Sequence, residues 1–462
     1  MFRIKEVISP TFIEALALVA SIVMIISVSI IKFKSVPHLP ILFSILLLIC
    51  YGLVKKVSYR KLEGGLVQGA GAGMSAVFLF FFIGILISSW MMSGTIPTLI
   101  YAGFNLITPS FFFAIVFVVT AIVGVSIGSS LTTVATVGVA FIGMASVLDL
   151  PMAITAGAIV SGAFFGDKMS PLSDTTNLAS SIVGVDLFEH IRNMGWTTIP
   201  AFVISLVIFG ALSPSVTVTE VDKISFFKEG LLETGMIHWY TIIPLVVLFI
   251  LTIMKVPALM TLALSSISAV GISFLHQSYS VTEVFKILFS GFVSTTGIVD
   301  IDALLTRGGM ESMMFTVGLV LLALSMGGLL FTLGIVQTLL SKVEKLLKKA
   351  SSVIAASALT AIGINVLIGE QYLSILLTGQ SFQSQYEKVG LAGKNLSRVM
   401  EDAGTVVNPL VPWSVCGIFI TGVLGVSTVE YLPFAFFCLL SPVLTVLFGF
   451  TGKTLTYTAD KK

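Results

Sequence analysis

Apolar residues fill long runs along the whole chain, and only short polar segments separate these runs. A run of about 20 apolar residues can cross the ~30 Å hydrocarbon core of a bilayer as one helix. The pattern therefore predicts a series of membrane-spanning helices. The clearest runs are residues 11–31, 39–54, 75–92, 111–125, 196–212, 240–254, 258–275, 313–340, 352–368 and 432–450.

Three further apolar stretches are interrupted by Gly and Ser, at residues 131–148, 152–165 and 415–426. Interruptions of this kind are typical of broken helices, or of helices that enter and leave the membrane on the same side. With these stretches included, the chain offers about 11 to 13 membrane elements. The expected fold is an all-α polytopic membrane protein.

The composition agrees with this class. Hydrophobic residues make up 56% of the chain and charged residues 10%, whereas a soluble domain carries about 25% charged residues. The net charge of +2 gives no reason to expect a nucleic-acid partner. The three cysteines show no ligand spacing, so we interpret them as packing residues and expect no cofactor. The lipid bilayer is an expected partner.

The chain also matches itself at an offset of about 239 residues, as expected of a duplicated transporter repeat. Residues 69–77, 120–122 and 170–172 fall in order on residues 308–316, 360–362 and 408–410. Each match is weak, but three matches in one register favour an internal duplication. We expect a first repeat at 1–212, a connector at 213–238 and a second repeat at 239–462.

The distribution of charge indicates that the two repeats are inverted. Four Lys and Arg residues at 55–61 precede the span at 75–92. In the second copy the order reverses, because Asp300 and Asp302 precede the matching span and four lysines at 342–349 follow it. Since loops rich in Lys and Arg stay in the cytoplasm, the two spans are expected to cross in opposite directions.

One polar string interrupts the first repeat at residues 166–177, GDKMSPLSDTTN. A charge at the bilayer centre costs roughly 2.5–3.5 kcal/mol, so such a string predicts a functional site. Pro171 breaks the helix and frees backbone carbonyls that can bind a cation. Asp174 is the best candidate ligand, followed by Asp167. The neighbouring polar candidates are Ser170, Ser173, Thr175, Thr176 and Asn177.

The second repeat carries its own break at Pro409, downstream of two acids. Carboxylate, hydroxyl, amide and backbone carbonyl oxygens are the ligands expected of a hard monovalent cation. Each half offers a small-polar stretch and, about 40 residues later, an acidic stretch broken by proline. The candidates are Asp402, Glu370, Glu401, Thr405, Asn365 and Asn408 in the second half, and Ser129, Thr132 and Thr133 in the first.

Carboxylates in a membrane can bind either a proton or Na⁺, and competition for one carboxylate is enough for antiport. A structural alternative stays open for two of them. Lys168 is adjacent to Asp167, and Arg398 lies four residues before Asp402, a spacing that permits an ion pair within a helix.

The string SGAFFGDKMSPLSDTTNLAS at 161–180 resembles the NhaC family of bacterial Na⁺/H⁺ antiporters. The resemblance extends over nearly the whole chain. It implies a multi-pass protein of the bacterial cell membrane that extrudes Na⁺ in exchange for protons, and that could associate with further copies of itself. In the wider group, small polar residues after each hairpin hold Na⁺. By analogy the ligands would be Ser173, Thr175, Asn177, Thr405 and Asn408.

Other functions remain as alternatives. Members of the same family exchange Na⁺-coupled lactate for malate and protons, which would require a basic residue for the organic acid. The basic candidates are Lys168, Arg192, Lys394 and Arg398. An intramembrane aspartyl protease would need glycine where Phe164 stands, so we do not expect an enzyme. A passive channel would move no ion uphill.

Overall fold

The computed structural model describes residues 6–106, 110–214, 218–343 and 349–458. Within these ranges helices are joined by loops, with two isolated β-bridges. Six of the described helices are long and apolar enough to cross a membrane, and up to eight are if each of two bent pairs is one span. Five shorter apolar helices accompany them. The chain is an all-α, multi-pass membrane protein, as the apolar runs predict.

The first half begins with a scaffold and continues into the segment that carries the polar string. The scaffold helices are α1 (Phe12–Ile31), α2 (His38–Val54), α3 (Tyr59–Ala72), α4 (Met74–Met92) and α5 (Thr95–Leu106). The helices that follow are α6 (Phe112–Ile127), α7 (Ser130–Thr133), α8 (Val139–Val147), α9 (Met152–Met169), α10 (Asp174–Val183) and α11 (Leu187–Leu212).

Helix α12 (Val218–Glu233) leads into the second half of the chain. Its scaffold is α13 (Ile243–Ile253), α14 (Ala258–Ser273), α15 (Val281–Ser290), α16 (Val299–Leu305), α17 (Met314–Thr332) and α18 (Ile335–Val343). The later helices are α19 (Ala350–Ile368), α20 (Gln371–Lys388), α21 (Gly393–Val399), α22 (Val415–Leu424), α23 (Thr428–Tyr431) and α24 (Phe436–Thr451).

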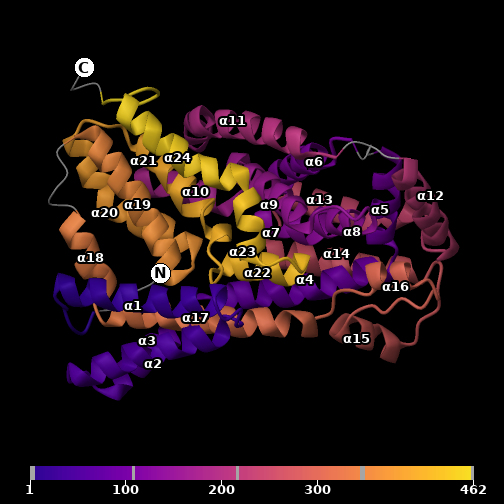
Figure 1. Ribbon diagram of the computed structural model, residues 1–462, viewed down its shortest axis with the longest axis horizontal. Coiled ribbons are helices and arrows are strands. Elements are labelled where there is room, and N and C mark those ends of the chain that lie inside the picture. Colours follow the sequence, from indigo (N-terminus) through magenta and orange to yellow (C-terminus); the bar gives the residue numbers. More distant parts are fainter. Residues whose placement is uncertain (1–5, 107–109, 215–217, 344–348, 459–462) are drawn as a thin grey trace.

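Two long elements cross the molecule side by side in opposite directions: α3 with α4, and α17 (Figure 1). Glycines bring them together. A Cβ added to Gly69 of α3 would lie 2.3 Å from the Leu324 carbonyl oxygen of α17. One added to Gly84 of α4 would lie 2.5 Å from the carbonyl oxygen of Gly309, which lies a few residues before α17. Small residues permit such close approach between membrane helices. As residue numbers rise along α3 and α4 they fall along α17, so the two are antiparallel, as the charge distribution predicts.

Matching helix ends recur at a constant spacing. Gly128 ends α6 with φ +70°, and Gly369 ends α19 with φ +75°. Ser173 caps α10, and Ser414 caps α22. Both pairs are 241 residues apart. This register differs by three residues from the match of 170–172 with 408–410, because helix ends follow the backbone whereas the sequence match follows a shared Pro-Leu pair.

Candidate functional site

The first break in the first half separates α6 from α7. Gly128 takes the left-handed conformation that glycine adopts without steric cost, and Ser129 caps the new helix with its side chain accepting from the Thr132 N–H at 3.3 Å. The new helix start presents the Ser130 N–H and hydroxyl to Asp167 Oδ2, at 3.1 and 2.7 Å. A helix N-terminus stabilises a carboxylate there. Asp167 is therefore buried with charge-stabilising donors.

Close packing of α9 on α6 brings Asp167 to this position. A Cβ added to Gly166 would lie 2.5 Å from Gly124, and one added to Gly162 would lie 2.0 Å from the Thr120 hydroxyl. The glycines thus let the two helices touch along their backbones. Helix α9 then ends at Met169, and the predicted break at Pro171 lies between α9 and α10.

The start of α10 divides the polar string between two environments. Ser173 and Thr175 are buried, with their hydroxyl oxygens 3.0 Å apart, and Ser173 lies close enough to Asp167 to interact with its carboxyl group. Asp174 and Asn177 are exposed instead. Asn177 donates to the Ser173 carbonyl oxygen at 2.7 Å. The structure therefore groups Asp167, Ser173 and Thr175, and it leaves Asp174 and Asn177 outside this group.

Other hydroxyls named as candidates in the first half are engaged with the backbone. Thr133 donates to the Ser129 carbonyl oxygen at 2.9 Å, Ser170 donates to Val125 O at 2.7 Å, and Thr176 donates to Lys168 O at 3.1 Å. Thr132 is buried, with its hydroxyl 3.0 Å from that of Ser129. These side chains stabilise the two breaks, so their oxygens are partly occupied.

The second half forms its break from different side chains. Glu370 caps α20 by accepting from the Leu373 N–H at 2.7 Å. Asn365 donates to the Gly404 carbonyl oxygen at 2.6 Å and accepts from Asn408 at 2.8 Å. Asn408 also accepts from the Cys416 N–H at 3.0 Å. The amides thus connect α19, the break before Pro409 and the start of α22.

A π-helical turn, Met400–Thr405, holds the buried acids of the second half. Turns of this kind are frequent at functional sites. Glu401, Asp402 and Thr405 are all 0% exposed. Among the described residues, no partner within hydrogen-bonding distance exists for either Glu401 oxygen, for Asp402 Oδ2 or for the Thr405 hydroxyl. Leaving buried polar groups without partners is costly, which is typical of a site that binds something.

A buried ion pair joins the two halves. Lys168 from α9 donates to Asp402 Oδ1, and both side chains are 0% exposed. The ammonium also lies 5.7 Å from the centre of the Phe437 ring. Asp167, Lys168 and Asp402 all lie close enough to Glu401 to interact with its charge. Three acids and one Lys, drawn from both halves, thus form one buried cluster.

Sequence reasoning missed parts of this cluster. Both local ion pairs that it left open, Lys168 with Asp167 and Arg398 with Asp402, are replaced by the pair between Lys168 and Asp402. It also did not single out His190, which is fully buried with both ring nitrogens unpartnered among the described residues. His190 is the fourth residue of α11, and no local pattern distinguishes it from an interfacial histidine.

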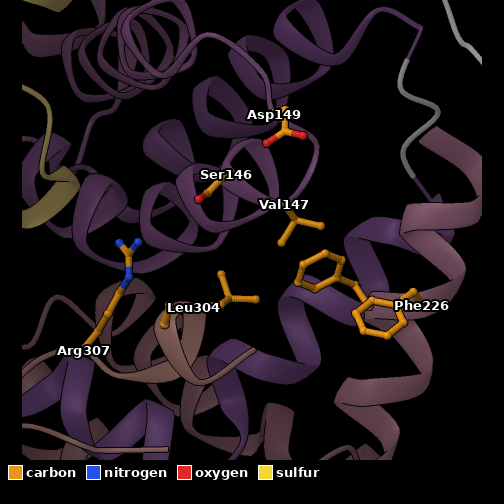
Figure 2. Close-up of a pocket in the computed structure, with 8 residues that line it drawn as sticks. Ser146, Val147, Asp149, Phe226, Leu304 and Arg307 are labelled. Atoms are coloured by element: carbon orange, nitrogen blue, oxygen red, sulfur yellow. The ribbon is translucent and has the colours of Figure 1, made fainter. Parts of the chain in front are cut away.

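Two cavities lie toward opposite ends of the molecule. One of about 340 Å³ is lined by Glu189, Arg192, Asn193, Trp196, Lys394 and Thr456. Lys394 there pairs with Glu189 at 2.8 Å. The other, about 300 Å³, lies between α8, α12 and α16 and includes Arg307 and Asp149 on different walls (Figure 2). Neither is lined by the buried acids. The Lys168, Glu401 and Asp402 side chains are 0% exposed, so the cluster is closed to solvent in this conformation.

Known proteins resemble this chain over most of its length. A model described as the Na⁺/H⁺ antiporter family matches residues 162–453. The Na⁺/H⁺ antiporter NhaC of Alkalihalophilus pseudofirmus is 42% identical over 95% of this chain and 95% of its own. NhaC of Bacillus subtilis is 39% identical over 90% and 93% of the two chains. The malate-2H⁺/Na⁺-lactate antiporter of Bacillus subtilis is 34% identical over 99% and 98%.

Proposed function

The chain belongs to the Na⁺/H⁺ antiporter family, and on that premise we propose that it exchanges Na⁺ for H⁺ at the buried cluster of Asp167, Lys168, Glu401 and Asp402. The observation that carries this proposal is the buried ion pair between Lys168 and Asp402, which joins the two halves beside an acid without a partner. The membrane would be the bacterial plasma membrane, as for a protein that extrudes Na⁺.

Exchange follows from competition for Asp402. When Na⁺ binds this carboxylate it displaces the Lys168 ammonium, and a lone ammonium in a buried site is strongly disfavoured. Lys168 then releases its proton to water on the side that is open. On the other side Na⁺ leaves, a proton returns to Lys168, and the ammonium pairs with Asp402 again. One Na⁺ is thus exchanged for one H⁺ at this pair.

Na⁺ needs further oxygen ligands at the cluster. The unpartnered Thr405 hydroxyl and Asp402 Oδ2 lie in the π-helical turn. Asp167, with the hydroxyls of Ser173 and Thr175, would supply the first half's share. All of these residues are among the candidates named from the sequence. Two other candidates, Asp174 and Asn177, are exposed and lie outside the buried cluster.

Glu401 sets the stoichiometry in this scheme. If Glu401 also gains and loses a proton in each cycle, two protons move for one Na⁺. The extra charge couples exchange to membrane potential, at about 2.3 kcal/mol per 100 mV. If it does not, exchange is electroneutral. Proton flux measured under an imposed potential separates the two cases.

The test is proton flux in vesicles that contain the purified protein, after Na⁺ is added to one side. Wild type should move protons against Na⁺, whereas Lys168→Met should not. Lys394→Gln is a matched control, because Lys394 forms a partly exposed pair with Glu189 of the kind that contributes about 0–1 kcal/mol. Equal flux in Lys168→Met and wild type would refute the proposal.

A Na⁺-coupled organic-acid exchanger is the second candidate function. The similarity to the malate-2H⁺/Na⁺-lactate antiporter supports it, as does Arg192, which lines a cavity and could hold a carboxylate. The same vesicles decide: flux with Na⁺ alone supports Na⁺/H⁺ exchange, and flux that requires lactate and malate on opposite sides supports the alternative.

A further inference from the structure

A second cation lies next to Asp402 in the chain. Arg398, in α21, is 0% exposed and precedes Asp402 by four residues, about one helical turn. Its Nη1 donates to the Thr454 hydroxyl at 3.1 Å and to the Thr454 carbonyl oxygen at 3.3 Å. Within the described residues, its Nε and Nη2 have no partner. A buried guanidinium therefore keeps unused donors beside the site.

Asp402 has an unused acceptor to match these unused donors. One of its oxygens accepts from Lys168, and the other, Oδ2, has no partner among the described residues. Donors and acceptor thus stand about one turn apart, both buried and both unsatisfied. The helix changes from α to π between them, at Met400. A change of this turn would alter their separation, because π and α turns hold different numbers of residues.

The segment that follows α24 binds Arg398 through Thr454 and so keeps it from pairing with Asp402. Residues 454–458 lie along the turn between α20 and α21, and we call them the strap. The strap is fastened by hydrogen bonds from the Ala392 N–H to Thr456 O at 2.9 Å and from Asn395 Nδ2 to the same oxygen at 2.7 Å. The Thr458 N–H donates to Gly390 O at 2.9 Å. Thr454, the residue that binds Arg398, thus stands at the start of an anchored segment.

We propose that Arg398 is a positioning residue for Na⁺/H⁺ exchange, serving as the alternative partner of Asp402. The inference rests on the proposed function. Between the departure of Na⁺ and the return of the proton to Lys168, Asp402 would be a bare buried carboxylate, which is strongly disfavoured. In that interval the Arg398 guanidinium forms an ion pair with the Asp402 carboxylate, and it thereby assists the release of Na⁺. The strap keeps Arg398 on Thr454 while Lys168 holds Asp402.

Two substitutions test this from opposite directions in the vesicle flux assay. Thr454→Val removes the hydroxyl that holds Arg398, so a freer guanidinium should compete with Na⁺ and raise the KM for Na⁺ about fivefold. Arg398→Gln removes the competitor, so Na⁺ leaves slowly, and both kcat and KM should fall. Arg398→Lys keeps the charge and should recover part of kcat.

The double variant decides whether the two residues act together. In the Arg398→Gln background, Thr454→Val should no longer raise the KM. The matched control is Thr458→Val, which removes another strap hydroxyl, 3.4 Å from Gly390 O, without touching Arg398. It should leave the KM within about twofold of wild type.

Different results would overturn the positioning role of Arg398 and the proposed exchange of Na⁺ for H⁺. If wild type moves protons with Na⁺ but Thr454→Val leaves the KM unchanged, or raises it equally without Arg398, the positioning role is wrong and the exchange function stands. An equal effect of Thr458→Val would reduce the strap to a structural element. If wild type moves no protons with Na⁺, both proposals fall. Since Thr454→Val leaves the buried charges in place, the test does not depend on Arg398→Gln folding.

Discussion

The two halves build the same pair of breaks, but they place different chemistry on them. In the 241-residue register of the matching helix ends, Asp167 of the first half falls on Asn408 of the second. Asp167 accepts a hydrogen bond from Ser130 at the start of α7, whereas Asn408 donates one to Asn365 in a network of uncharged amides. The backbone plan is shared and the charge is not. A repeated scaffold can thus supply the geometry of two breaks while one cluster concentrates the ionisable groups.

The buried acids of the two halves also differ in how many hydrogen bonds they accept. Asp167 has two donors from Ser130, but Glu401 has none among the described residues. Lys168 of the first half pairs with Asp402 of the second. Hydrogen bonds fix a buried charged group in one position. A buried acid without hydrogen bonds changes its ion-pair partner or its protonation state more easily. We infer that the first half supplies a fixed acid and a mobile cation, and the second half supplies the acids that react.

The largest effect is expected from Asp402→Asn. Na⁺-driven proton flux should disappear, and the free energy of unfolding should fall by about 3–5 kcal/mol, because Lys168 is left buried and unpaired. Flux in vesicles and thermal unfolding in detergent measure the two effects. Combining Asp402→Asn with Lys168→Met should restore stability without restoring flux. Wild-type flux in Asp402→Asn would remove the second half from the exchange reaction.

Glu401→Gln is expected to separate function from stability. It takes no hydrogen bond away from the described structure, so the melting temperature should not fall. If Glu401 carries a proton in each cycle, exchange should drop on the order of 10²-fold. Glu370→Gln is the matched control from the same half. It weakens the cap of α20, so it should lose about 1 kcal/mol of stability and keep most of its exchange. The reverse result would make Glu370 the reacting acid.

Much of this arrangement could be predicted from the sequence. Apolar run lengths gave the membrane class, and Pro171 with its polar neighbours marked a real break. The pairing of Lys168 with Asp402 could not be predicted, because it joins residues 234 positions apart and local spacing favours other partners. The burial of single residues was also hidden. Asp167 and Asp174 lie in one polar string, at the end of α9 and the start of α10. Only packing against helices that are distant in the sequence buries the first and exposes the second, so the two look alike in the sequence.

Ser130→Ala tests whether the hydrogen bonds of the first half matter to its acid. The change removes the 2.7 Å hydroxyl bond to Asp167, and a bond to a charged group contributes about 1.5–3 kcal/mol. Exchange should fall about tenfold. The control in the second half is Ser374→Ala, whose hydroxyl donates to the backbone of Ala361 at 2.8 Å and accepts from Asn365 at 3.5 Å, without touching an acid. Its flux per folded molecule should stay near wild type, and equal losses in both would mean that packing, not Asp167, was disturbed.

The smallest effect is expected from Asp174→Asn, although the sequence alone ranks Asp174 first among the ligands. In the structure this carboxylate is exposed at the start of α10, outside the buried group around Asp167. Water screens an exposed charge far more than a buried one, so the substitution should raise the KM for Na⁺ by no more than about threefold. The KM should also depend on ionic strength less in Asp174→Asn than in wild type, if the carboxylate only attracts Na⁺. Complete loss of exchange, with the protein folded, would move the Na⁺ site from the buried cluster to the mouth of α10 and reverse the roles assigned to the two halves.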